Sequence, residues 1–422
     1  MTTSITPERD IQDKVTPEKS SSQHDGKIIL LKGQSQYDVV RIFIDDVAEG
    51  FRQLGHDAIV VDMMQEDYFK KIASIKGKAK CFFSFNGMGT GLEVNQQPLF
   101  DYLGTPLVTW HVDHPFYLQD RINYPMKRSV VIVSNENYYQ FYLKHYRKPG
   151  VVSKCLQIAG RQYVKELVPY DKRENDLVFF GSCMGPLEKQ AQLLNSKDKT
   201  LNELIWETVE AAKYEQEIEL SDIFYANLQH MGLNHEELPQ PVLQYFLSNM
   251  DVYLRIFRRR HVLNALKDFP LKIYGNGWED FDGEKNNFTF YKAATFIDTL
   301  EIMSKSKLTL NVMPNNRTGI HDRISYGMHQ GAVCLSDATP GMKQDIEHNQ
   351  HVLFYDMASD LSESLPQKVH EALGDLNNLE TVAEKAMHHA KVRFNWTDRA
   401  SEIIRLVDTH NMAMALTNAS GA

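Results

Sequence analysis

The sequence is poor in cysteine and contains no long apolar run. Its 422 residues include four cysteines, which are scattered and form no Cys-x-x-Cys pair. Neither a disulfide framework nor a zinc site is therefore expected, and the thiols are predicted to be buried and reduced. No stretch approaches the roughly 20 apolar residues that cross a bilayer, and the N-terminus lacks the apolar core of a signal peptide. We therefore expect a cytoplasmic protein without a membrane span.

Basic residues are also fewer than acidic residues. Lysine and arginine together number 46 against 55 acidic residues, which gives a net charge of −9. Such a balance argues against a broad nucleic-acid-binding surface. Hydrophobic residues make up 42% of the chain and charged residues 24%, as in an ordinary globular protein. The length is sufficient for two or three domains.

The first half of the chain alternates short apolar runs with segments of helical periodicity. Residues 1–26 are polar and are predicted to form a disordered tail. After them, strands are predicted at 27–32, 56–62, 79–85, 106–110 and 129–134, and helices at 38–54 and 67–75. Alternating strands and helices indicate right-handed βαβ units and hence a parallel sheet.

The second half repeats this alternation around a helical interruption. Residues 185–268 are rich in Leu, Glu, Gln, Lys and Ala and nearly free of glycine, so they are predicted to form several helices. Strands are predicted at 175–181, 271–274, 288–291, 308–311, 332–335 and 351–354, and helices at 295–304, 322–330, within 358–392 and at 397–415. We predict an α/β protein with Rossmann-like domains at 27–172 and 173–395, a helical insertion at 185–268, and a C-terminal helix and tail at 396–422.

Glycines and small polar residues follow several of the predicted strands. The carboxyl edge of an open parallel sheet is where such folds bind ligands. In the run Gly319-Ile-His-Asp-Arg323, Gly319 lets a backbone approach a phosphate, Asp322 can cap the following helix, and Arg323 offers a planar fork for phosphate oxygens. The alternative is a helix cap with a surface arginine, and His321 is either a phosphate donor or a loop residue.

The second half also contains a set of motifs at predicted strand ends. They are Phe180-Gly-Ser182, Tyr274-Gly-Asn-Gly-Trp278, Leu310-Asn311, Arg323 with Gly331 eight residues later, and Leu335-Ser-Asp337. Together they resemble the spore-maturation-protein-like (CgeB-like) group of GT-B glycosyltransferases. Two segments of the first half match more loosely, Thr109-Trp-His-Val-Asp-His-Pro115 and Val133-Ser-Asn135. The resemblance covers residues 80–360 and implies a GT-B-like fold, in which two Rossmann-like domains face each other across a cleft.

The resemblance further implies that the second domain holds a nucleotide sugar, expected to be a UDP-sugar, and that the first holds the acceptor. The expected donor-binding residues are Gly181, Ser182, Gly275, Asn276, Gly277, Trp278, Asn311, His321, Arg323 and Tyr326. No metal and no further cofactor are expected, because helix N-termini and basic side chains can stabilise a departing diphosphate. Tyr326 departs from the family, which usually has an acidic residue there to hold the donor ribose. For the Gly-Asn-Gly turn, Trp278 and Asn311, a structural role is the alternative.

His111, Asp113 and His114 form the densest cluster of titratable side chains after a predicted buried strand. A general base must take the proton of the acceptor hydroxyl, and Asp113 or a neighbouring histidine suits that role. Each of the three could instead be structural, and the pattern His-x-Asp-His could also hold a metal. We predict that the catalytic group on the acceptor side is among these three residues.

Two further segments are less specific. Residues 85–91 are glycine-rich but lack the Lys-Ser/Thr ending of a P-loop, so they are interpreted as a mobile loop beside the cleft. Arg258-Arg-Arg-His261 is interpreted as a solvated face of the helical insertion, where an acidic acceptor or a protein partner could dock.

Three functions are compatible with these residues. The favoured one is transfer of a sugar from a nucleotide sugar to an unidentified acceptor, which is a glycan, a protein or a small molecule. A nucleotide-sugar epimerase on the same fold would use Asp113 and His321 as paired titratable groups. A non-catalytic binding or morphogenetic protein would be consistent with Tyr326 and with an insertion able to contact proteins.

Overall fold

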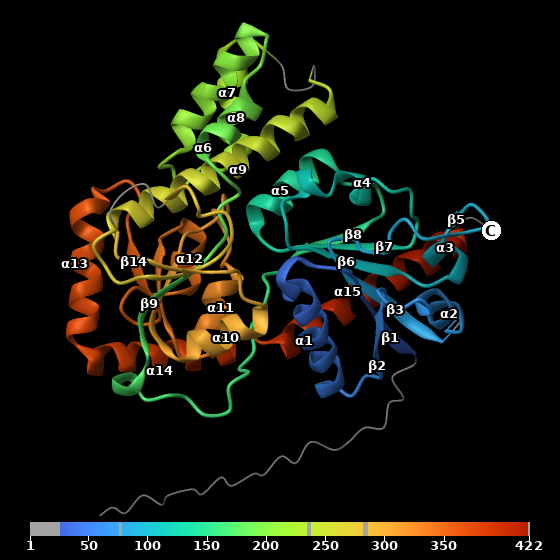
Figure 1. The fold of residues 1–422 in the computed structure, drawn as a ribbon. Coiled ribbons are helices and arrows are strands. Elements are labelled where there is room, and N and C mark those ends of the chain that lie inside the picture. Colours follow the sequence, from blue (N-terminus) through green and yellow to red (C-terminus); the bar gives the residue numbers. More distant parts are fainter. Residues whose placement is uncertain (1–25, 76–77, 234–237, 282–285, 421–422) are drawn as a thin grey trace, which may run out of the picture.

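The computed structural model describes residues 26–75, 78–233, 238–281 and 286–420. Two parallel-sheet domains lie side by side, and a group of helices (α6 to α9, here called the crown) stands above the line where they meet (Figure 1). Both predicted parallel sheets are present. Residues 1–25 of the predicted tail lie outside the described residues.

The first domain is built on a six-stranded parallel sheet in the order β2-β1-β3-β6-β7-β8. Residues 28–31 of β1 are fully buried, as expected of a strand that is covered on both faces. Helix α1 packs through an apolar stripe that contains Phe43, Val47 and Phe51, each four residues after the last. The strands are β1 Lys27–Lys32, β2 Ala58–Asp62, β3 Ala79–Phe85, β6 Leu107–His111, β7 Ser129–Val133 and β8 Val152–Cys155. The helices are α1 Val39–Gln53, α2 Tyr68–Ala73, α3 Leu99–Leu103, α4 Gln119–Ile122 and α5 Glu136–His145, with short 3-10 turns at Gln36–Asp38 and Pro115–Tyr117 and a small hairpin of β4 Glu93–Val94 and β5 Gln97–Pro98.

The second domain has a six-stranded parallel sheet in the order β11-β10-β9-β12-β13-β14. In each sheet the chain runs to one side of the first strand before it crosses to the other, so the order reverses between β1 and β3 and between β9 and β12. The strands are β9 Asn175–Phe180, β10 Lys272–Tyr274, β11 Thr289–Tyr291, β12 Ser306–Asn311, β13 Val333–Asp337 and β14 Leu353–Tyr355. The helices are α10 Phe296–Ser304, α11 Asp322–His329, α12 Pro340–Asp345, α13 Leu361–Gly374 and α14 Leu376–Arg393, and a 3-10 turn at Tyr170–Lys172 precedes β9.

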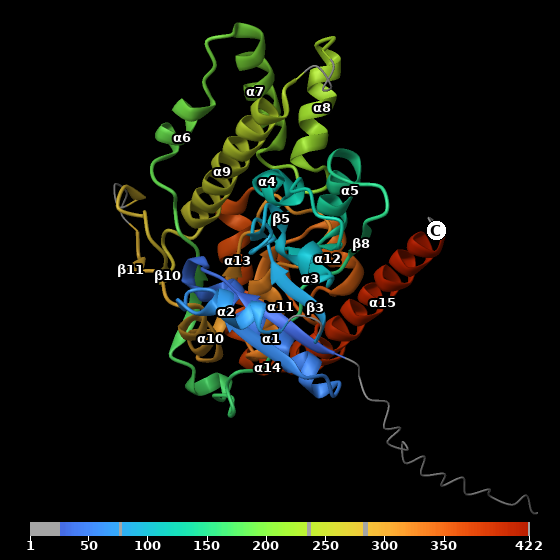
Figure 2. The same ribbon diagram turned by 90° about the vertical axis from the view of Figure 1, so that its right-hand side faces the viewer.

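The crown is inserted between β9 and β10, and it packs on both domains (Figure 2). One hydrophobic core joins crown residues such as Leu204 and Leu247 to Phe116, Val133 and Phe141 of the first domain. The predicted helical insertion is thus confirmed, and it bridges the two domains. Its helices are α6 Leu187–Leu194, α7 Lys199–Ala212, α8 Leu220–His230 and α9 Gln240–Ala265.

The last helix, α15 Trp396–Ser420, leaves the second domain and packs on α1, β7 and β8 of the first. Its first residue joins an aromatic cluster between the domains that consists of Phe43, Phe296, Tyr326 and Trp396 and is here called the floor. The rings of Phe43 and Tyr326 stack with centroids 5.6 Å apart, one ring from each domain. The hydrophobic core is therefore continuous beneath the cleft.

The predicted strands agree with the observed ones to within two residues at each end. Strand β8 was not predicted, because its residues are only partly buried and give a weak apolar signal at the sheet edge. In the part of the chain that the structure describes, no helix is both long and apolar enough to cross a membrane.

Candidate functional site

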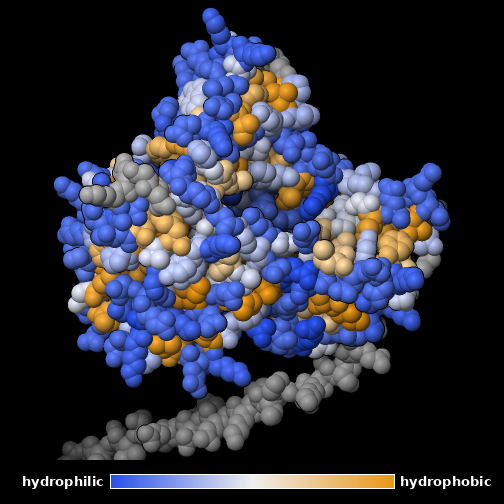
Figure 3. Space-filling model, viewed as in Figure 1, coloured by the Kyte–Doolittle hydropathy of each residue, from blue (hydrophilic) through white to orange (hydrophobic). Residues whose placement is uncertain are grey.

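A cavity of about 700 Å³ lies between the domains, with α9 of the crown and the floor among its boundaries. Both reversals of strand order face this cavity, and such reversals are where open α/β sheets bind ligands. Figure 3 shows a hollow between the crown and the two domains. Residues that follow strands line the cavity in both domains: Gln34 to Tyr37 after β1, Asn86 after β3, Asp113 after β6, Gly181 and Ser182 after β9, and Pro314 and Asn316 after β12.

Arg323 reaches the cavity from the first turn of α11. His321 stands at the N-cap of this helix, and Asp322 makes the predicted contact with the helix start, because its Oδ1 accepts from the Arg323 N–H at 2.9 Å. His321 Nδ1 contacts the same carboxylate oxygen, and His321 Nε2 accepts from Arg323 Nη2 at 3.2 Å. Burial and the charge of Arg323 lower the pKa of His321, so the ring is neutral at pH 7. Among the described residues, Arg323 Nη1 has no hydrogen-bond partner. The guanidinium therefore offers a free donor to an anion, beside the positive end of the α11 dipole.

Two more arginines, Arg255 and Arg259, reach the same wall from α9. Arg259 Nη1 donates to the carbonyl oxygen of Ser182, and burial together with the charges of Arg323 and Arg255 lowers the pKa of Arg259 to about 9. Against the effect of burial, Asp251 raises the pKa of Arg255, with which it forms an ion pair of 2.8 Å. Of the three arginines, only Arg255 has such an ion pair within the described part of the chain. Asp322 lies next to Arg323, whereas Arg259 is acted on chiefly by the charges of Arg323 and Arg255, and such like charges on one wall favour an anionic ligand.

The prediction that Arg258 to Arg260 form one solvated face is wrong. Arg258 is 1% exposed and donates to Asn315 at 2.6 Å and to backbone carbonyls that follow α7. Arg259 lines the cavity, whereas Arg260 pairs with Asp280 at 2.6 Å. Successive residues of a helix point about 100° apart, so three neighbouring side chains take three directions.

Gly275 and Gly277 lie outside the cavity wall, contrary to the prediction. A Cβ on Gly275 would lie 2.1 Å from the carbonyl oxygen of Gly181, and one on Gly277 would lie 1.8 Å from that of Cys183. Glycine is therefore needed because two strand-end loops pack against each other. Trp278 is buried and donates its Nε1–H to Gly181 at 2.8 Å, so core packing explains it.

Gly181 and Ser182 line the cavity, in agreement with their predicted position. A Cβ on Gly181 would lie 2.7 Å from Cζ of Phe179, so glycine is needed here by packing against that ring, and Arg259 lies close by. Ser182 Oγ accepts from the N–H of Asn276 at 3.1 Å and lies 3.1 Å from the hydroxyl of Tyr37. Asn276 is exposed next to this loop.

Three other residues of the family motifs lie away from the cavity: Tyr326, contrary to prediction, Asn311, in line with its alternative structural role, and Gly331. Asn311 is 2% exposed, and its Nδ2 donates to Ser336 at 2.8 Å. Tyr326 is fully buried in the floor, and its hydroxyl donates to Asp46 at 2.6 Å. Gly331 follows the opposite end of α11 from Arg323, and its carbonyl accepts from Arg173.

Asp46, on α1, is a buried acid beneath the floor. Besides the bond from Tyr326, it accepts a hydrogen bond of 2.6 Å from the hydroxyl of Tyr163. Burial raises the pKa of Asp46 to about 6, although these donors oppose the change. Tyr326 thus ties α11 to the first domain.

Asp113 of the first domain opens into the cavity. Asn86 Nδ2 donates to Asp113 Oδ2 at 2.7 Å, and Asn86 Oδ1 accepts from the N–H of Val112 at 2.9 Å. Desolvation by the surrounding protein raises the pKa of Asp113, although the charge of Arg255 and the bond from Asn86 oppose the change. Asn86 therefore fixes one oxygen of a carboxylate whose other oxygen is available to a substrate hydroxyl, as a general base requires.

His111 and His114 do not line this cavity, contrary to the prediction. His111 is 1% exposed, its Nε2 lies 3.2 Å from Thr109 Oγ1, and burial lowers its pKa to about 3. His114 Nδ1 accepts from the N–H of Phe116, whose ring stacks on the imidazole with centroids 3.8 Å apart. Burial also lowers the pKa of His114. Of the three predicted catalytic residues, Asp113 alone is placed to meet a substrate.

Sequence reasoning missed several residues that line the cavity. Arg255 and Arg259 are four positions apart and share a helix face, and this spacing is the feature of the sequence from which their common location could have been predicted. Asn86 belongs to the glycine-rich segment that was predicted to lie beside the cleft. Tyr37 and Arg121 belong to no motif.

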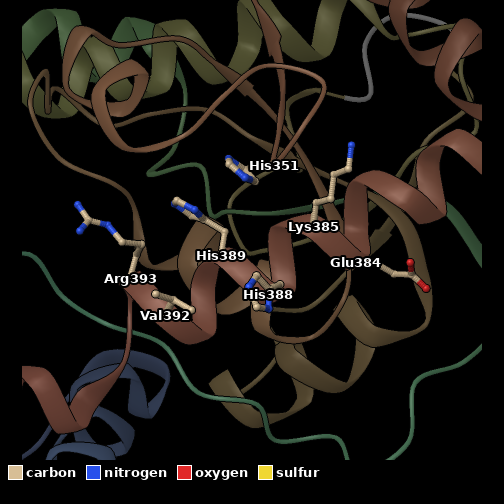
Figure 4. Close-up of a pocket in the computed structure, with 7 residues that line it drawn as sticks. All are labelled: His351, Glu384, Lys385, His388, His389, Val392 and Arg393. Atoms are coloured by element: carbon tan, nitrogen blue, oxygen red, sulfur yellow. The ribbon is translucent and has the colours of Figure 1, made fainter. Parts of the chain in front are cut away.

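A second hollow of about 520 Å³ lies on the second domain alone (Figure 4). The rings of His351 and His389 stack there with centroids 4.1 Å apart, and Arg393 pairs with Asp345 at 3.2 Å. Within the described ranges, no three His, Cys, Asp or Glu side chains are grouped as metal ligands would be. The residues of this hollow are His351, Glu384, Lys385, His388, His389, Val392 and Arg393.

Comparison with known proteins supports the architecture. A family model described as glycosyl transferase-like matches residues 258–405. No curated protein matches the chain in sequence. An alpha-glucosyltransferase solved in complex with UDP-glucose and DNA containing an abasic site has a TM-score of 0.53 at 12% identity, covering 90% of this chain and 99% of that one. Sucrose-phosphate synthase from Thermosynechococcus elongatus has a TM-score of 0.51 at 10% identity, covering 92% and 100%.

At these identities the likeness to solved structures concerns the fold. Two parallel Rossmann-like sheets, a cavity between their strand ends and the match of residues 258–405 agree with one another. The chain has the GT-B fold, with a helical insertion in the second domain, and its residues 258–405 match a family model described as glycosyl transferase-like.

Proposed function

We propose that this protein is a nucleotide-sugar-dependent glycosyltransferase with a UDP-sugar as donor. The observation that carries the proposal is the convergence of Arg255, Arg259 and Arg323 on one wall of the cavity, at the N-terminus of α11. Glycosyl transfer leaves a nucleoside diphosphate behind, and preorganised positive groups stabilise its growing negative charge. The alpha-glucosyltransferase with the same fold was solved with UDP-glucose, which supports uridine as the base.

In this proposal the donor diphosphate binds between Arg259 and Arg323. Arg323 presents a planar fork to the phosphate oxygens, and the amides in the first turn of α11 add their dipoles. Nε2 of the neutral His321 accepts from Arg323 Nη2, and Asp322 accepts from the Arg323 N–H, so both the side chain and the backbone of Arg323 are held in place. Gly181 and Arg259 both line the cavity, so that an oxygen of the donor can approach that guanidinium from the cavity.

Asp113 acts as the general base of the proposed reaction. The acceptor oxygen attacks the anomeric carbon, and its proton passes to the carboxylate of Asp113. The bond between that carbon and the diphosphate oxygen breaks, and the nucleoside diphosphate leaves with the electron pair. The raised pKa of Asp113 makes its ionised form a stronger proton acceptor than an ordinary carboxylate.

The acceptor and the setting of the reaction belong to the same proposal. Free buried thiols such as Cys81 and Cys334 support a reducing, cytoplasmic compartment. The net charge of −9 favours a glycan, a protein or a small molecule over a nucleic acid as acceptor. The CgeB-like group remains the predicted subgroup, on the motifs Phe180 to Ser182 and Tyr274 to Trp278.

Nucleotide release from UDP- and GDP-sugars tests the proposal. Wild type is expected to release UDP, and Arg323→Ala and Arg259→Ala are expected to lose that activity because the diphosphate loses its cationic partners. Arg260→Ala is the matched control, since this neighbour on α9 pairs with Asp280 and does not line the cavity. Failure of the wild type to bind any nucleotide sugar, or full activity of Arg323→Ala, contradicts the proposal.

The alternative functions give different results in the same assay. An epimerase converts the nucleotide sugar without an acceptor, but Asp322 and Arg323 engage the two ring nitrogens of His321, which disfavours that histidine as a proton shuttle. A non-catalytic protein binds nucleotide without turnover. Because Tyr326 bonds to Asp46 away from the cavity, the tyrosine itself does not obstruct the donor site.

A further inference from the structure

The segment that connects β1 to α1 extends into the cavity from the first domain. This segment, residues 33–38, is here called the β1 loop. Tyr37 and Asp38 adopt left-handed conformations in succession, with φ of 54° and 62°. Residues with a side chain seldom occupy this region, and they keep such conformations where surrounding contacts hold them. The contacts of the β1 loop therefore indicate what holds it.

The base of the β1 loop is fixed within the first domain. Arg41 Nη1 donates to the carbonyl oxygen of Gly33 at 3.1 Å, and Arg41 also pairs with Asp62 at 2.7 Å. Ser35 Oγ accepts from the N–H of Val40 at 3.0 Å. These contacts bind the base to α1 and β2 and leave the tip to reach across the cavity.

The tip of the β1 loop is held by the opposite wall. The hydroxyl of Tyr37 lies 3.1 Å from Ser182 Oγ and accepts from Asn276 Nδ2 at 3.4 Å. The carbonyl oxygen of the same serine accepts from Arg259. The phenolic oxygen therefore lies at the loop that contacts Arg259, which is one of the groups proposed to bind the diphosphate.

We propose that the Tyr37 hydroxyl competes with the donor for Ser182 and Asn276, so that the β1 loop gates the donor site. The inference rests on the proposed function, because it takes the ligand at Arg259 and Arg323 to be a nucleotide sugar. An oxygen of the donor diphosphate takes the hydrogen-bonding position that Tyr37 holds. The loop tip then withdraws toward the first domain and is free to leave its left-handed conformation.

Tyr37 is not needed to hold the two domains together. The stacked rings of Phe43 and Tyr326 join the domains below the cavity. The N–H of Asn137 in the first domain donates to Thr318 Oγ1 in the second at 2.8 Å. Removing one phenolic hydroxyl leaves these contacts in place, so its effect on binding reports competition at the donor site.

The variant Tyr37→Phe tests the gate by calorimetric titration with UDP. Loss of a competing group increases the fraction of molecules able to bind, so the Kd for UDP is expected to fall roughly three- to tenfold. Tyr139→Phe is the matched control: its hydroxyl contacts Ser153 within the first domain, and its loss should leave the Kd unchanged. In wild type, saturating UDP is also expected to speed hydrogen exchange of the amides of residues 34–39.

The outcomes separate the gate from the transferase proposal. If wild type binds UDP but Tyr37→Phe binds it equally or more weakly, the gate is overturned and the transferase proposal stands. Protection of residues 34–39 by UDP also overturns the gate, because the loop would then close over the nucleotide. If neither wild type nor Tyr37→Phe binds UDP, both proposals are overturned.

Discussion

The two walls of the cavity carry different charges although each lies at the strand ends of a six-stranded parallel sheet, and α9 of the crown adds residues to the second-domain wall. The second-domain wall presents Arg255, Arg259 and Arg323 around a helix N-terminus. The first-domain wall presents Asp113, held by Asn86, and its one arginine, Arg121, donates to the carbonyl oxygen of Asn86 at 2.7 Å. The fold thus supplies the same location twice, and the side chains on each wall decide its chemistry. The second-domain wall can stabilise a departing anion, and the first-domain wall supplies a proton acceptor.

The largest effect on turnover is expected from Asp113→Asn, which removes the proton acceptor from the first-domain wall. We expect kcat to fall by roughly 10²- to 10⁴-fold, with little change in the Kd for UDP, because the other wall is untouched. In wild type, the raised pKa of Asp113 predicts that activity falls as the pH drops through a value above 3.8, and the variant should lack that acidic limb. If Asp113→Asn instead binds UDP more weakly and keeps the wild-type pH profile, the assignment of proton transfer to one wall and donor binding to the other is contradicted.

The next largest effect is expected from Arg259→Ala or Arg323→Ala on the opposite wall. Each removes a charge-assisted hydrogen bond worth about 1.5 to 3 kcal/mol, so the Kd for UDP should rise roughly ten- to a hundredfold. Titration calorimetry checks this, with Arg260→Ala unchanged because it pairs with Asp280. Equal losses in all three variants would indicate a general effect of charge on α9 and α11.

A smaller effect concerns the buried acid beneath both walls. The folded-state pKa of Asp46 is raised from 3.8 to about 6 by burial, so its charged form destabilises the fold. The stability that Asp46 supplies is fully present below pH 3.8 and is lost as the pH rises through about 6, at a cost of roughly 3 kcal/mol. Urea unfolding should therefore show a difference between wild type and Asp46→Asn that shifts by this amount between pH 4 and pH 7. A difference that is constant with pH would contradict the burial of an ionisable group at this place.

The smallest effect on turnover is expected from His111→Asn and His114→Asn. Both histidines are buried away from the cavity, so the folded variants should keep the wild-type kcat. Stability should fall by about 1 to 3 kcal/mol, because buried polar groups lose their partners. Parallel measurements of kcat and of urea unfolding separate the two effects. A large loss of kcat in a folded variant would show that the substituted histidine takes part in catalysis.

The strands could be predicted from sequence because their apolar runs are short, buried and bounded by polar residues. The positions of Gly181, Asp113 and Arg323 at the cavity followed from their places after strands or at a helix start. The roles of Gly275 and Gly277 could not be predicted, since they depend on a neighbouring loop that is almost a hundred residues away in the chain.

Other predictions were wrong because they assumed the wrong direction for a side chain on a helix. The run Arg258 to Arg260 looked uniform, but the helix turns one side chain into the core, one into the cavity and one outward. Tyr326 lies one turn after Arg323 on the same helix and yet faces Asp46 of the other domain. Such outcomes depend on how helices pack, which a single sequence does not specify.

A crystal structure of this protein with UDP tests the division between the two walls. We expect the diphosphate to lie within hydrogen-bonding distance of Arg259 and Arg323, with Asp113 facing it across the cavity and free of contact with phosphate. A diphosphate bound elsewhere, for example in the hollow beside His351 and His389, with both arginines unoccupied, would contradict the central claim.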